Sequence, residues 1–402
     1  MHTPPATPAT TESPLQILVL APQPFFQERG TPIAVRVLAE ELAEAGHGVD
    51  LLVFHEGQPV AMSGVTVHRT PALPGLRGIK PGFSLKKMFC DGLMLLKSLR
   101  LVRRKQYHVI HAVEEAAFLA LVLQFFFDIP FVYDMDSLLS MQLTDKFPLL
   151  VGLTRSMEWC EQKVMRRSRG IVAVCQALEE KAKAVAPTVP VVRLEDISLL
   201  GASTEAGEDI RREHGIGGCV FMYVGNLESY QGIDLLLEAF ALFPVEDRQR
   251  ASLVVIGGRA EDIADYRDRA NQLALGGQVF FLGPRPVEHL GHYLAQADVL
   301  VSPRIQGNNT PMKIYSYLDS GRPILATRIP SHTQVLDGSI ALLAEAEPHA
   351  FMQAMTTLQG DEPLRRALAL AARETVRRNY SREAFRGKLR AFYHNLDIAS
   401  HR

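Results

Sequence analysis

The sequence predicts an α/β protein built from two Rossmann-like domains. Continuous apolar runs typical of buried strands alternate with amphipathic helical segments along the chain, which is the pattern of parallel sheets covered on both faces. A strand, a loop, a helix and a second strand follow one another twice, in residues 16–54 and again in residues 220–258. With 402 residues the chain is long enough for more than one domain, so this repeat favours two sheets over one large sheet.

The first half opens with a buried strand at residues 16–21 (QILVLA), followed by the loop PQPFFQERG. An amphipathic helix at residues 31–45 comes next, ended by Gly46. The next strand is VDLLVF at residues 49–54. Further strands are expected at residues 108–113, 130–135 and 170–175.

The second half repeats this opening with a strand at residues 220–224, the loop GNLESYQG and a helix at residues 233–243. A strand at residues 251–258 follows. Further strands are expected at residues 278–283, 298–303, 323–328 and 339–344. The last predicted helix, residues 382–396, carries one apolar stripe and therefore needs a groove in which to pack.

The boundary between the domains is expected within residues 192–212, which are acidic and lack a clear period. Residues 1–14, rich in Thr, Pro and Ala, are expected to be disordered. The predicted limits are 15–195 for the N-terminal domain, 196–380 for the C-terminal domain and 381–402 for the terminal helix segment.

Composition excludes several classes of protein. A formal net charge of −1 gives no case for nucleic-acid binding. The sequence shows no signal peptide and no run of the ~18 apolar residues that a membrane span needs. Cysteines are scattered without a CxxC motif or a Cys/His cluster, which argues against zinc and disulfides and favours a reducing cytoplasm. They are Cys90, Cys160, Cys175 and Cys219.

Residues 301–327 (VSPRIQGNNTPMKIYSYLDSGRPILAT) carry the strongest functional signal. The pattern predicts a strand end, a polar loop, a short helix and a second strand. Thr310 suits the N-cap and Pro311 the first helical position, and Gly321 fits just past the helix end. The free N–H groups of the first turn, together with Lys313, predict an anion site.

Amides and cations gather around this predicted helix start. Asn308 and Asn309 precede it, Arg304 comes from the loop, and Lys313 and Ser316 share one helix face because they are three residues apart. This chemistry suits a diphosphate and a polyhydroxylated group. The alternative is an ordinary loop with a structural cap, and the density of amides beside two cations favours the ligand site.

Two glycine loops precede helices at the start of each half. Arg29 and Gly30 end the first loop, and Gly30 can let a ligand approach the backbone. The second loop offers Asn226 and Gln231 as hydrogen-bond donors. Neither loop has the GxGxxG spacing and no GxxxxGK[ST] motif is present, so a standard nicotinamide or P-loop site is disfavoured.

Polar residues follow two further strands. His111 and Glu114 come at the end of a predicted strand, where they could orient hydroxyls or act as acid and base; Glu115 is a weaker candidate, and a helix N-terminus would favour both glutamates through its dipole. Asp134 and Asp136 form a DxD triplet that could bind a metal on a diphosphate. For both carboxylates to reach one metal the chain would have to turn there, and a helix cap at Asp136 is the favoured interpretation.

Residues 77–105 hold nine basic residues against one acid, Asp91, with apolar residues interleaved. A basic amphipathic segment indicates an anionic membrane surface as partner. The alternative is a solvated helix whose apolar side packs on the sheet.

Taken together, these motifs resemble glycosyltransferase family 4, nucleotide-sugar-dependent enzymes of the GT-B fold. The resemblance runs from Leu15 to about Leu396 and rests on the order of ILVLAPQPFFQERG, YVGNLESYQGIDLLLEAF, LVVIGG, FLGPR, ADVLVSP and TPMKIYSYLDSGRPILAT. It implies two domains facing a central cleft, with the donor nucleotide on the C-terminal domain, the acceptor on the N-terminal one, and the final helix packing back on the N-terminal domain. It also implies retention of anomeric configuration and no metal or other cofactor, the nucleotide-sugar being the donor substrate.

The sequence departs from the family pattern at several positions. Asn308 and Ser316 stand where the family has paired glutamates, and Asn226 and Gln231 stand where it has Arg and Lys. Only His111 remains of a His-x-His-like stretch, since Val113 takes the other position. We interpret the chain as a divergent but active subfamily, with His111, Glu114 and Asn308 as catalytic candidates. The donor candidates are Gly30, Asn226, Gln231, Arg304, Asn309, Thr310, Lys313 and Ser316.

The expected function is transfer of a sugar to a lipid-linked or saccharide acceptor in cell-envelope or polysaccharide synthesis, by a cytoplasmic enzyme that is peripheral on the inner face of the plasma membrane. One alternative is a non-catalytic nucleotide-sugar-binding partner of another glycosyltransferase. A metal-dependent GT-A enzyme using Asp134 and Asp136, and a GT-B epimerase, which would need a carboxylate-rich cleft, are less consistent with the sequence.

Overall fold

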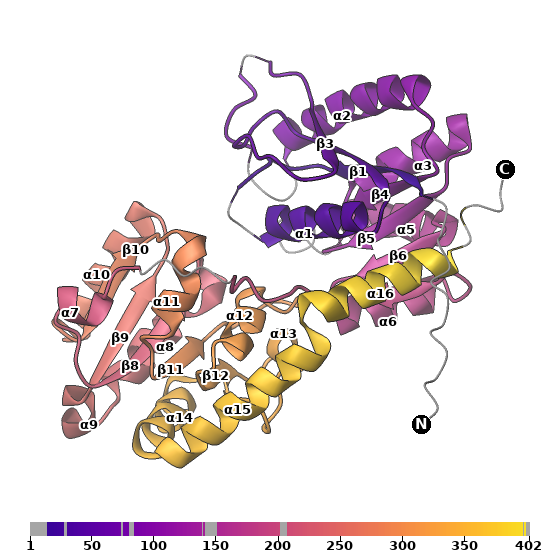
Figure 1. Cartoon of the computed structure of the whole chain (residues 1–402). Helices are drawn as coiled ribbons and strands as arrows, with labels where there is room; N and C mark the ends of the chain where they lie inside the picture. The colour runs from indigo at the N-terminus through magenta and orange to yellow at the C-terminus, as the bar shows by residue number, and fades with distance from the viewer. Residues whose placement is uncertain are drawn as a thin grey trace, which may run out of the picture. The chain divides into compact units, whose positions relative to one another are not determined.

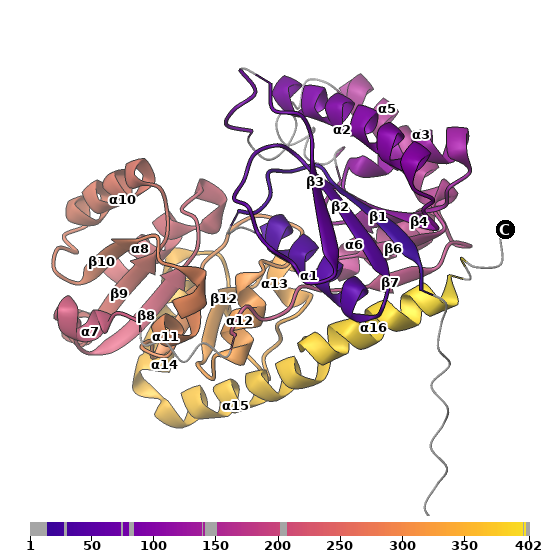
Figure 2. The ribbon, with the colours of Figure 1, turned by 45° about the horizontal axis from the view of Figure 1, so that its top comes forward.

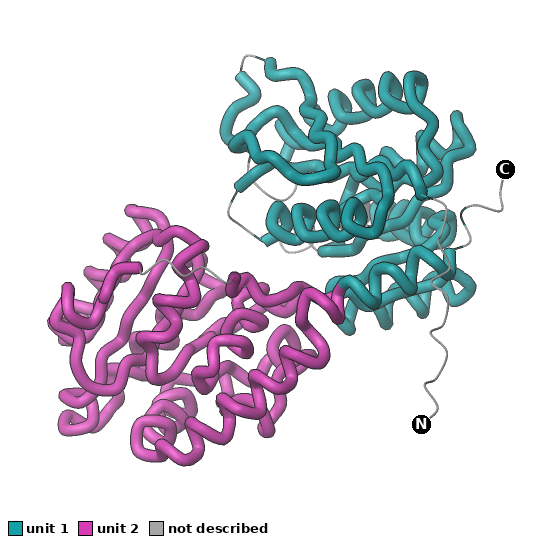
Figure 3. Tube along the Cα trace, in the orientation of Figure 1, with its two compact units in different colours: residues 1–194, 386–402 teal, residues 195–385 magenta. Residues whose placement is uncertain are grey.

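The computed structural model divides the chain into two compact units (Figure 3). Unit 1 comprises residues 1–194 together with 386–402, and unit 2 comprises residues 195–385. The chain therefore returns to its first unit at the end. The structure describes residues 14–27, 30–73, 75–79, 84–138, 140, 151–201, 207–396 and 398. Residues 1–13, most of the predicted disordered N-terminus, lie outside this part of the chain.

Unit 1 is built on a seven-stranded, fully parallel sheet in the order β3-β2-β1-β4-β5-β6-β7 (Figure 1). Its central strands are apolar throughout because both faces are covered. The strands are β1 (Gln16–Ala21), β2 (Gly48–Val53), β3 (Val65–Arg69), β4 (Val109–Val113), β5 (Phe131–Met135), β6 (Gly170–Ala173) and β7 (Val191–Arg193).

Helices cover both faces of this sheet (Figure 2). Leu18 and Leu20 of β1 face a core shared with α2, α3, α5 and α6, whereas His111 of β4 faces Tyr393 of α16 on the other side. Arg386 of α16 donates to Glu41 of α1, with Nε 2.5 Å from Oε2. The helices are α1 (Gly30–Glu44), α2 (Leu85–Arg104), α3 (Ala116–Phe127), α5 (Val151–Arg167), α6 (Gln176–Val185) and α16 (Arg382–Asn395), the last beginning in unit 2.

Unit 2 has a six-stranded parallel sheet in the order β10-β9-β8-β11-β12-β13. Alternate residues of β8 face opposite cores, since Phe221 packs with one apolar cluster and Met222 with another. The strands are β8 (Cys219–Val224), β9 (Ala251–Ile256), β10 (Val279–Gly283), β11 (Val299–Ser302), β12 (Ile324–Thr327) and β13 (Leu342–Ala344).

The helices of unit 2 divide between the two faces of the sheet. Residues of α8, α10 and α14 pack in the cluster that contains Phe221, and residues of α7, α11, α12 and α15 in the cluster that contains Met222. Among the described residues, no helix of either unit combines the length and apolar character needed to cross a membrane. The helices are α7 (Ile210–Glu213), α8 (Ile233–Ala241), α9 (Val245–Gln249), α10 (Ala260–Gln272), α11 (Leu290–Leu294), α12 (Lys313–Asp319), α13 (Pro330–Thr333), α14 (Pro348–Gly360) and α15 (Glu362–Asn379), with short 3-10 turns η1 (Ser229–Gln231) and η2 (Val287–His289).

The two Rossmann-like sheets confirm the predicted fold class, and every strand expected from the sequence is present. Two strands were not predicted, β3 and β7, which form the edges of the first sheet. Their side chains are only partly buried, so neither strand shows the continuous apolar run that marks a central strand.

Candidate active site

Two loops of unit 2 meet at the carboxyl ends of β8 and β11, which are neighbours in the sheet. The N–H of Ile305 donates to the carbonyl oxygen of Tyr230 over 2.9 Å and ties the loops together. Gly232 has φ +75°, and a Cβ there would lie 2.0 Å from the carbonyl oxygen of Pro303. The close approach of the loops therefore depends on a glycine at this position.

Lys313, the first residue of α12, extends into the space between these loops. Its Nζ donates to Oε1 of the buried Gln231 over 3.2 Å and lies 3.8 Å from the centroid of the Tyr223 ring. A Cβ on Gly225, whose φ is +150°, would lie 2.9 Å from Nζ. The missing side chain of Gly225 thus makes room for the ammonium group.

Arg304 supplies a second cation from the loop after β11. Its Nε donates to the carbonyl oxygen of Gln306 over 2.6 Å, and Nη1 to that of Asn309 over 3.2 Å. Its guanidinium carbon lies 5.1 Å from the centroid of the Tyr230 ring. Every one of these partners is neutral, and a cation over an aromatic ring is stabilised without loss of its charge.

Among the described residues, the two cations lack a compensating anion. Neither Lys313 nor Arg304 forms an ion pair within the described part of the chain. Burial lowers the pKa of Lys313 well below its usual value, and the charge of Arg304 lowers it further. Burial also lowers the pKa of Arg304. An anion bound between them would stabilise both charged forms, so the site is electrostatically prepared for an anionic ligand.

His332, a fully buried residue of α13, holds in place the loop that carries Arg304, which we call the arginine loop. Its Nδ1 lies 2.9 Å from the carbonyl oxygen of Thr327, so this nitrogen carries the proton, and Nε2 accepts from the hydroxyl of Ser302 over 2.9 Å. The hydroxyl of Thr327 in turn donates to the carbonyl oxygen of Arg304. Burial lowers the pKa of His332 to about 4, with the charges of Arg304 and Lys313 acting in the same direction. No sequence motif pointed to His332 as a site residue.

The other predicted donor residues lie in different environments. Asn226 and Asn308 are exposed, and their main-chain carbonyl oxygens accept from Tyr223 and Gln334, respectively. Asn309 is partly buried beside Arg304. Asn309 thus contacts one of the two cations through its carbonyl oxygen.

Ser316 is placed differently. It is fully buried, and its hydroxyl accepts from the N–H of Leu199 over 3.0 Å. This contact gives Ser316 a structural role in holding the segment that enters unit 2.

The start of α12 differs from the prediction. The helix begins at Lys313, and Met312, not Thr310, occupies the N-cap without a side-chain hydrogen bond. The N–H of Ile314 donates to the carbonyl oxygen of Pro311, so part of the first turn is already satisfied. The predicted cap was wrong, since Thr310 is buried in the loop. Cationic side chains, rather than free backbone N–H groups, make this site attractive to an anion.

The predicted end of α12 is close to the observed one. The helix ends at Asp319, and Gly321 follows with φ +72°. This left-handed backbone is the conformation for which glycine is preferred after a helix.

His111 in unit 1 is a fully buried histidine with both ring nitrogens engaged. Nε2 lies 3.1 Å from Oδ2 of Asp134 and Nδ1 lies 2.8 Å from the hydroxyl oxygen of Tyr393. Because a carboxylate accepts, Nε2 donates and Nδ1 accepts from the tyrosine. His111 thus joins α16 to the sheet, a structural role that no local motif indicates.

Two other predicted residues of unit 1 lie at strand ends. Glu114 follows β4 with φ +50°, an unusual conformation for a residue with a side chain, and its Oε1 accepts from the hydroxyl of Ser137 over 2.9 Å. Gly30 is the first residue of α1, and a Cβ there would meet nothing within 4 Å. The space around Gly30 is open, whereas its neighbour Arg29 lies outside the described residues.

The two aspartates of the DxD triplet lie within β5 and just after it. Asp134 is the fourth residue of β5 and pairs with His111, and Asp136 follows the strand. Throughout the residues that the structure describes, no three His, Cys, Asp or Glu side chains are grouped so that they could hold a metal ion.

Both units match known protein families. Residues 29–195 match the glycosyl transferase 4-like domain, and residues 218–361 match the glycosyl transferases group 1 domain. Curated relatives include the D-inositol 3-phosphate glycosyltransferases of Corynebacterium diphtheriae, 29% identical over 189 residues, and Corynebacterium glutamicum, 28% identical over 209 residues. These matches cover 45% and 50% of this chain, and 44% and 50% of the relatives, so the chain spans about half the length of the curated relatives it matches.

Solved structures share the fold over nearly the whole chain. Sucrose-phosphate synthase from Thermosynechococcus elongatus superimposes with a TM-score of 0.78 at 20% identity, covering 96% of this chain and 100% of that one. HepE from Anabaena, solved in complex with UDP, gives a TM-score of 0.74 at 15% identity, with 95% and 100% covered. At such identities these likenesses show the GT-B fold alone.

The buried His332 predicts a pH-dependent stability. Its pKa is lower in the folded chain, at about 4, than the ~6.5 of an unfolded histidine, so the unfolded state binds more protons between these values. The contribution of His332 is therefore fully present above about pH 6.5 and lost as the pH falls toward 4. Replacing His332 with Gln should make the free energy of unfolding, measured in urea, fall less between about pH 7 and about pH 5 than in the wild type.

The exposed His349 on α14 provides the control. His349→Gln should show the same acid-induced loss as the wild type. An equal loss in His332→Gln and the wild type would contradict the assignment of a buried neutral imidazole.

Proposed function

The chain belongs to the glycosyltransferases, since its two units carry a glycosyl transferase 4-like domain and a glycosyl transferases group 1 domain, and on this premise we propose that it transfers a sugar from a nucleotide-diphosphate sugar to an acceptor. Unit 2 binds the donor. Lys313 and Arg304 hold its diphosphate, and Gln231, Asn226, Asn308 and Asn309 surround the nucleotide and sugar.

The observation that carries this proposal is the uncompensated pair of cations. Lys313 and Arg304 are held by neutral groups, and burial lowers the pKa of both. A diphosphate supplies the missing negative charge and gains more as the bond to the sugar breaks, because charge then develops on the leaving group. HepE, which shares the fold, binds UDP and UDP-glucose in its solved structures, which supports a donor of this class.

The finer features of the reaction follow the family resemblance. The sugar is transferred with retention of configuration, to a lipid-linked or saccharide acceptor in cell-envelope or polysaccharide synthesis. Asn308 is exposed near Arg304 and can hydrogen-bond a sugar hydroxyl. Glu114 remains the candidate acid or base of unit 1, whereas His111 and Ser316 are left out because both are fully buried and already hydrogen-bonded.

One observation favours a second candidate, a non-catalytic nucleotide-sugar-binding partner of another glycosyltransferase. Asn308 and Ser316 stand where the family resemblance places glutamates, and an amide stabilises developing positive charge on a sugar less than a carboxylate does. Hydrolysis of UDP-glucose by the purified chain separates the candidates, because a binding partner would bind the donor without turnover.

The surface of α2 supports a location on an anionic membrane. Its apolar residues do not all serve the core, since Leu85 and Phe89 are 81% and 54% exposed. Two predicted lipid-facing lysines are engaged elsewhere, because Lys87 is buried against Glu115 and Lys105 pairs with Asp50. The exposed basic residues that remain on α2 are Lys86, Arg100, Arg103 and Arg104.

Replacing Lys313 with Met tests the donor site. A hydrogen bond to a charged group contributes about 1.5–3 kcal/mol, so affinity for UDP-glucose should fall roughly 10- to 100-fold in calorimetry. The same change should leave the unliganded chain at least as stable in urea, because it removes a buried ammonium group that has no counter-charge. Arg366→Met, which removes an exposed charge on α15, is the control and should change neither quantity. Unchanged affinity in Lys313→Met would remove the phosphate role.

Replacing Lys86, Arg100, Arg103 and Arg104 with Gln tests the membrane surface. Each basic residue near an anionic bilayer contributes about 1 kcal/mol, so sedimentation with phosphatidylglycerol vesicles at low salt should be largely lost, while UDP-glucose affinity stays the same.

A matched variant separates this surface from general charge. It carries the same change at four exposed arginines of α15, Arg366, Arg373, Arg377 and Arg378, and should sediment like the wild type. If the wild type does not sediment with anionic vesicles at low salt, α2 is an ordinary solvated helix. A soluble acceptor would then be favoured.

A further inference from the structure

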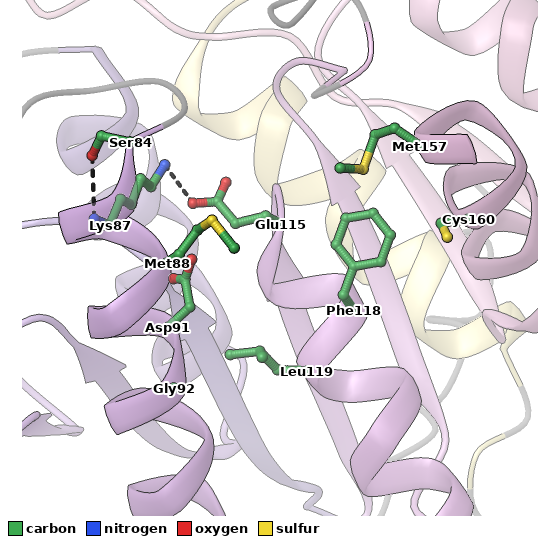
Figure 4. Close-up of a pocket in the computed structure, with 10 residues that line it drawn as sticks. All are labelled: Ser84, Lys87, Met88, Asp91, Gly92, Glu115, Phe118, Leu119, Met157 and Cys160. Carbon is green, nitrogen blue, oxygen red and sulfur yellow. Dashed lines mark hydrogen bonds and ion pairs between the residues drawn. The ribbon is translucent and has the colours of Figure 1, made fainter. Parts of the chain in front are cut away.

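Unit 1 contains a cavity that none of the preceding roles uses (Figure 4). It has a volume of about 400 Å³ and lies between α2, α3 and α5, which places it in the size range of small-molecule sites. Its apolar wall is formed by Met88 of α2, Phe118 and Leu119 of α3, and Met157 of α5.

The polar groups of the cavity gather at one side. Lys87 and Glu115 form an ion pair, and their side chains are 10% and 9% exposed. Asp91, one turn after Lys87 on α2, also lines the cavity. Its Oδ1 is buried and accepts no hydrogen bond from the described chain. A buried polar atom without a partner is costly, so this oxygen indicates a hydrogen-bonding ligand.

The charges of these groups limit what the ligand can be. Lys87 brings one ammonium group to the cavity, and Glu115 and Asp91 bring two carboxyl groups. Burial raises the pKa of Asp91 to about 8, with the charge of Glu115 acting in the same direction and that of Lys87 opposing it. Burial raises the pKa of Glu115 as well, so the two carboxyl groups carry less than two negative charges opposite the single ammonium group of Lys87, and the cavity has little net charge. A free carboxylate or ammonium group would lose its hydration there without gaining a counter-charge.

We propose that this cavity binds a neutral amphiphile that carries hydroxyl groups, with its apolar part against Met88, Phe118 and Met157 and a hydroxyl at Asp91. The exposed apolar side chains of Leu85 and Phe89 on α2 offer a continuing path for a longer chain. If the proposed function holds, this amphiphile is the acceptor. The acceptor role therefore rests on the proposed function, whereas the binding of an amphiphile by the cavity does not rest on it.

The experiment measures binding of octyl β-D-glucopyranoside, below its micelle concentration, to the full chain by calorimetry. Octanoate and octylammonium have the same apolar chain with a negative or positive head group. The glucoside should bind at least about tenfold more tightly than either ion, a difference of about 1.4 kcal/mol. Equal or tighter binding of an ion, or no binding of the glucoside, would overturn the proposal.

A glycine at the cavity rim provides a matched pair of variants. Gly92 lies within α2, and a Cβ added there would meet nothing within 4 Å. Gly92→Ala should keep glucoside binding and improve helix propensity, whereas Gly92→Leu should fill the cavity and reduce binding about tenfold or more. Equal binding by both variants would place the glucoside elsewhere and contradict the assignment.

Substitution of Asp91 tests the hydrogen bond. Asp91→Asn keeps a neutral hydrogen-bonding group of similar shape and should bind the glucoside within about threefold of the wild type, whereas Asp91→Leu should lose about tenfold. Both variants should bind UDP-glucose as tightly as the wild type does. A negative result for glucoside binding would therefore contradict the cavity proposal and leave the proposed donor site unaffected. If the wild type does not bind UDP-glucose, that result would instead contradict the proposed function.

Discussion

The placement of two cations without a counter-charge is the constraint on which the site of unit 2 depends. Lys313 and Arg304 are brought together by loops that approach closely because Gly232 has no side chain, and the missing side chain of Gly225 makes room for the ammonium group. Aromatic rings, carbonyl oxygens and one amide hold them, and His332 fixes the arginine loop from behind. The fold therefore holds positive charge that is not compensated until a diphosphate binds. In an ordinary buried ion pair, by contrast, the counter-charge belongs to the protein itself.

Much of the fold could be predicted because parallel strands buried on both faces leave continuous apolar runs. The edge strands β3 and β7 were missed since half-exposed side chains leave no such run. The start of α12 was misplaced for a related reason. Thr310 and Pro311 resemble a cap in sequence, but Thr310 is buried in the loop and the helix begins at Lys313. Tertiary packing overrode a local signal.

The part of the candidate site that consists of clustered charged residues could be predicted from the sequence. The part whose role depends on tertiary packing could not. Lys313 and Arg304 are noticeable in the sequence because Asn308, Asn309 and Thr310 lie between them. His332 is not, because its role depends on Thr327 and Ser302 meeting it across strands. His111 was interpreted as catalytic, yet its environment is set by Tyr393, 282 residues later in the chain. No local pattern reports such a contact.

The most direct test of the uncompensated pair is the number of protons taken up when UDP-glucose binds, measured by calorimetry in buffers of different ionisation enthalpy at several pH values between about 7 and about 9. An ordinary lysine, with a pKa of about 10.4, is already protonated there and would take up none. Burial lowers the pKa of Lys313, and a bound diphosphate should raise it again. The account predicts that the wild type takes up more protons than Lys313→Met within this pH range. The same proton count in both proteins would contradict it.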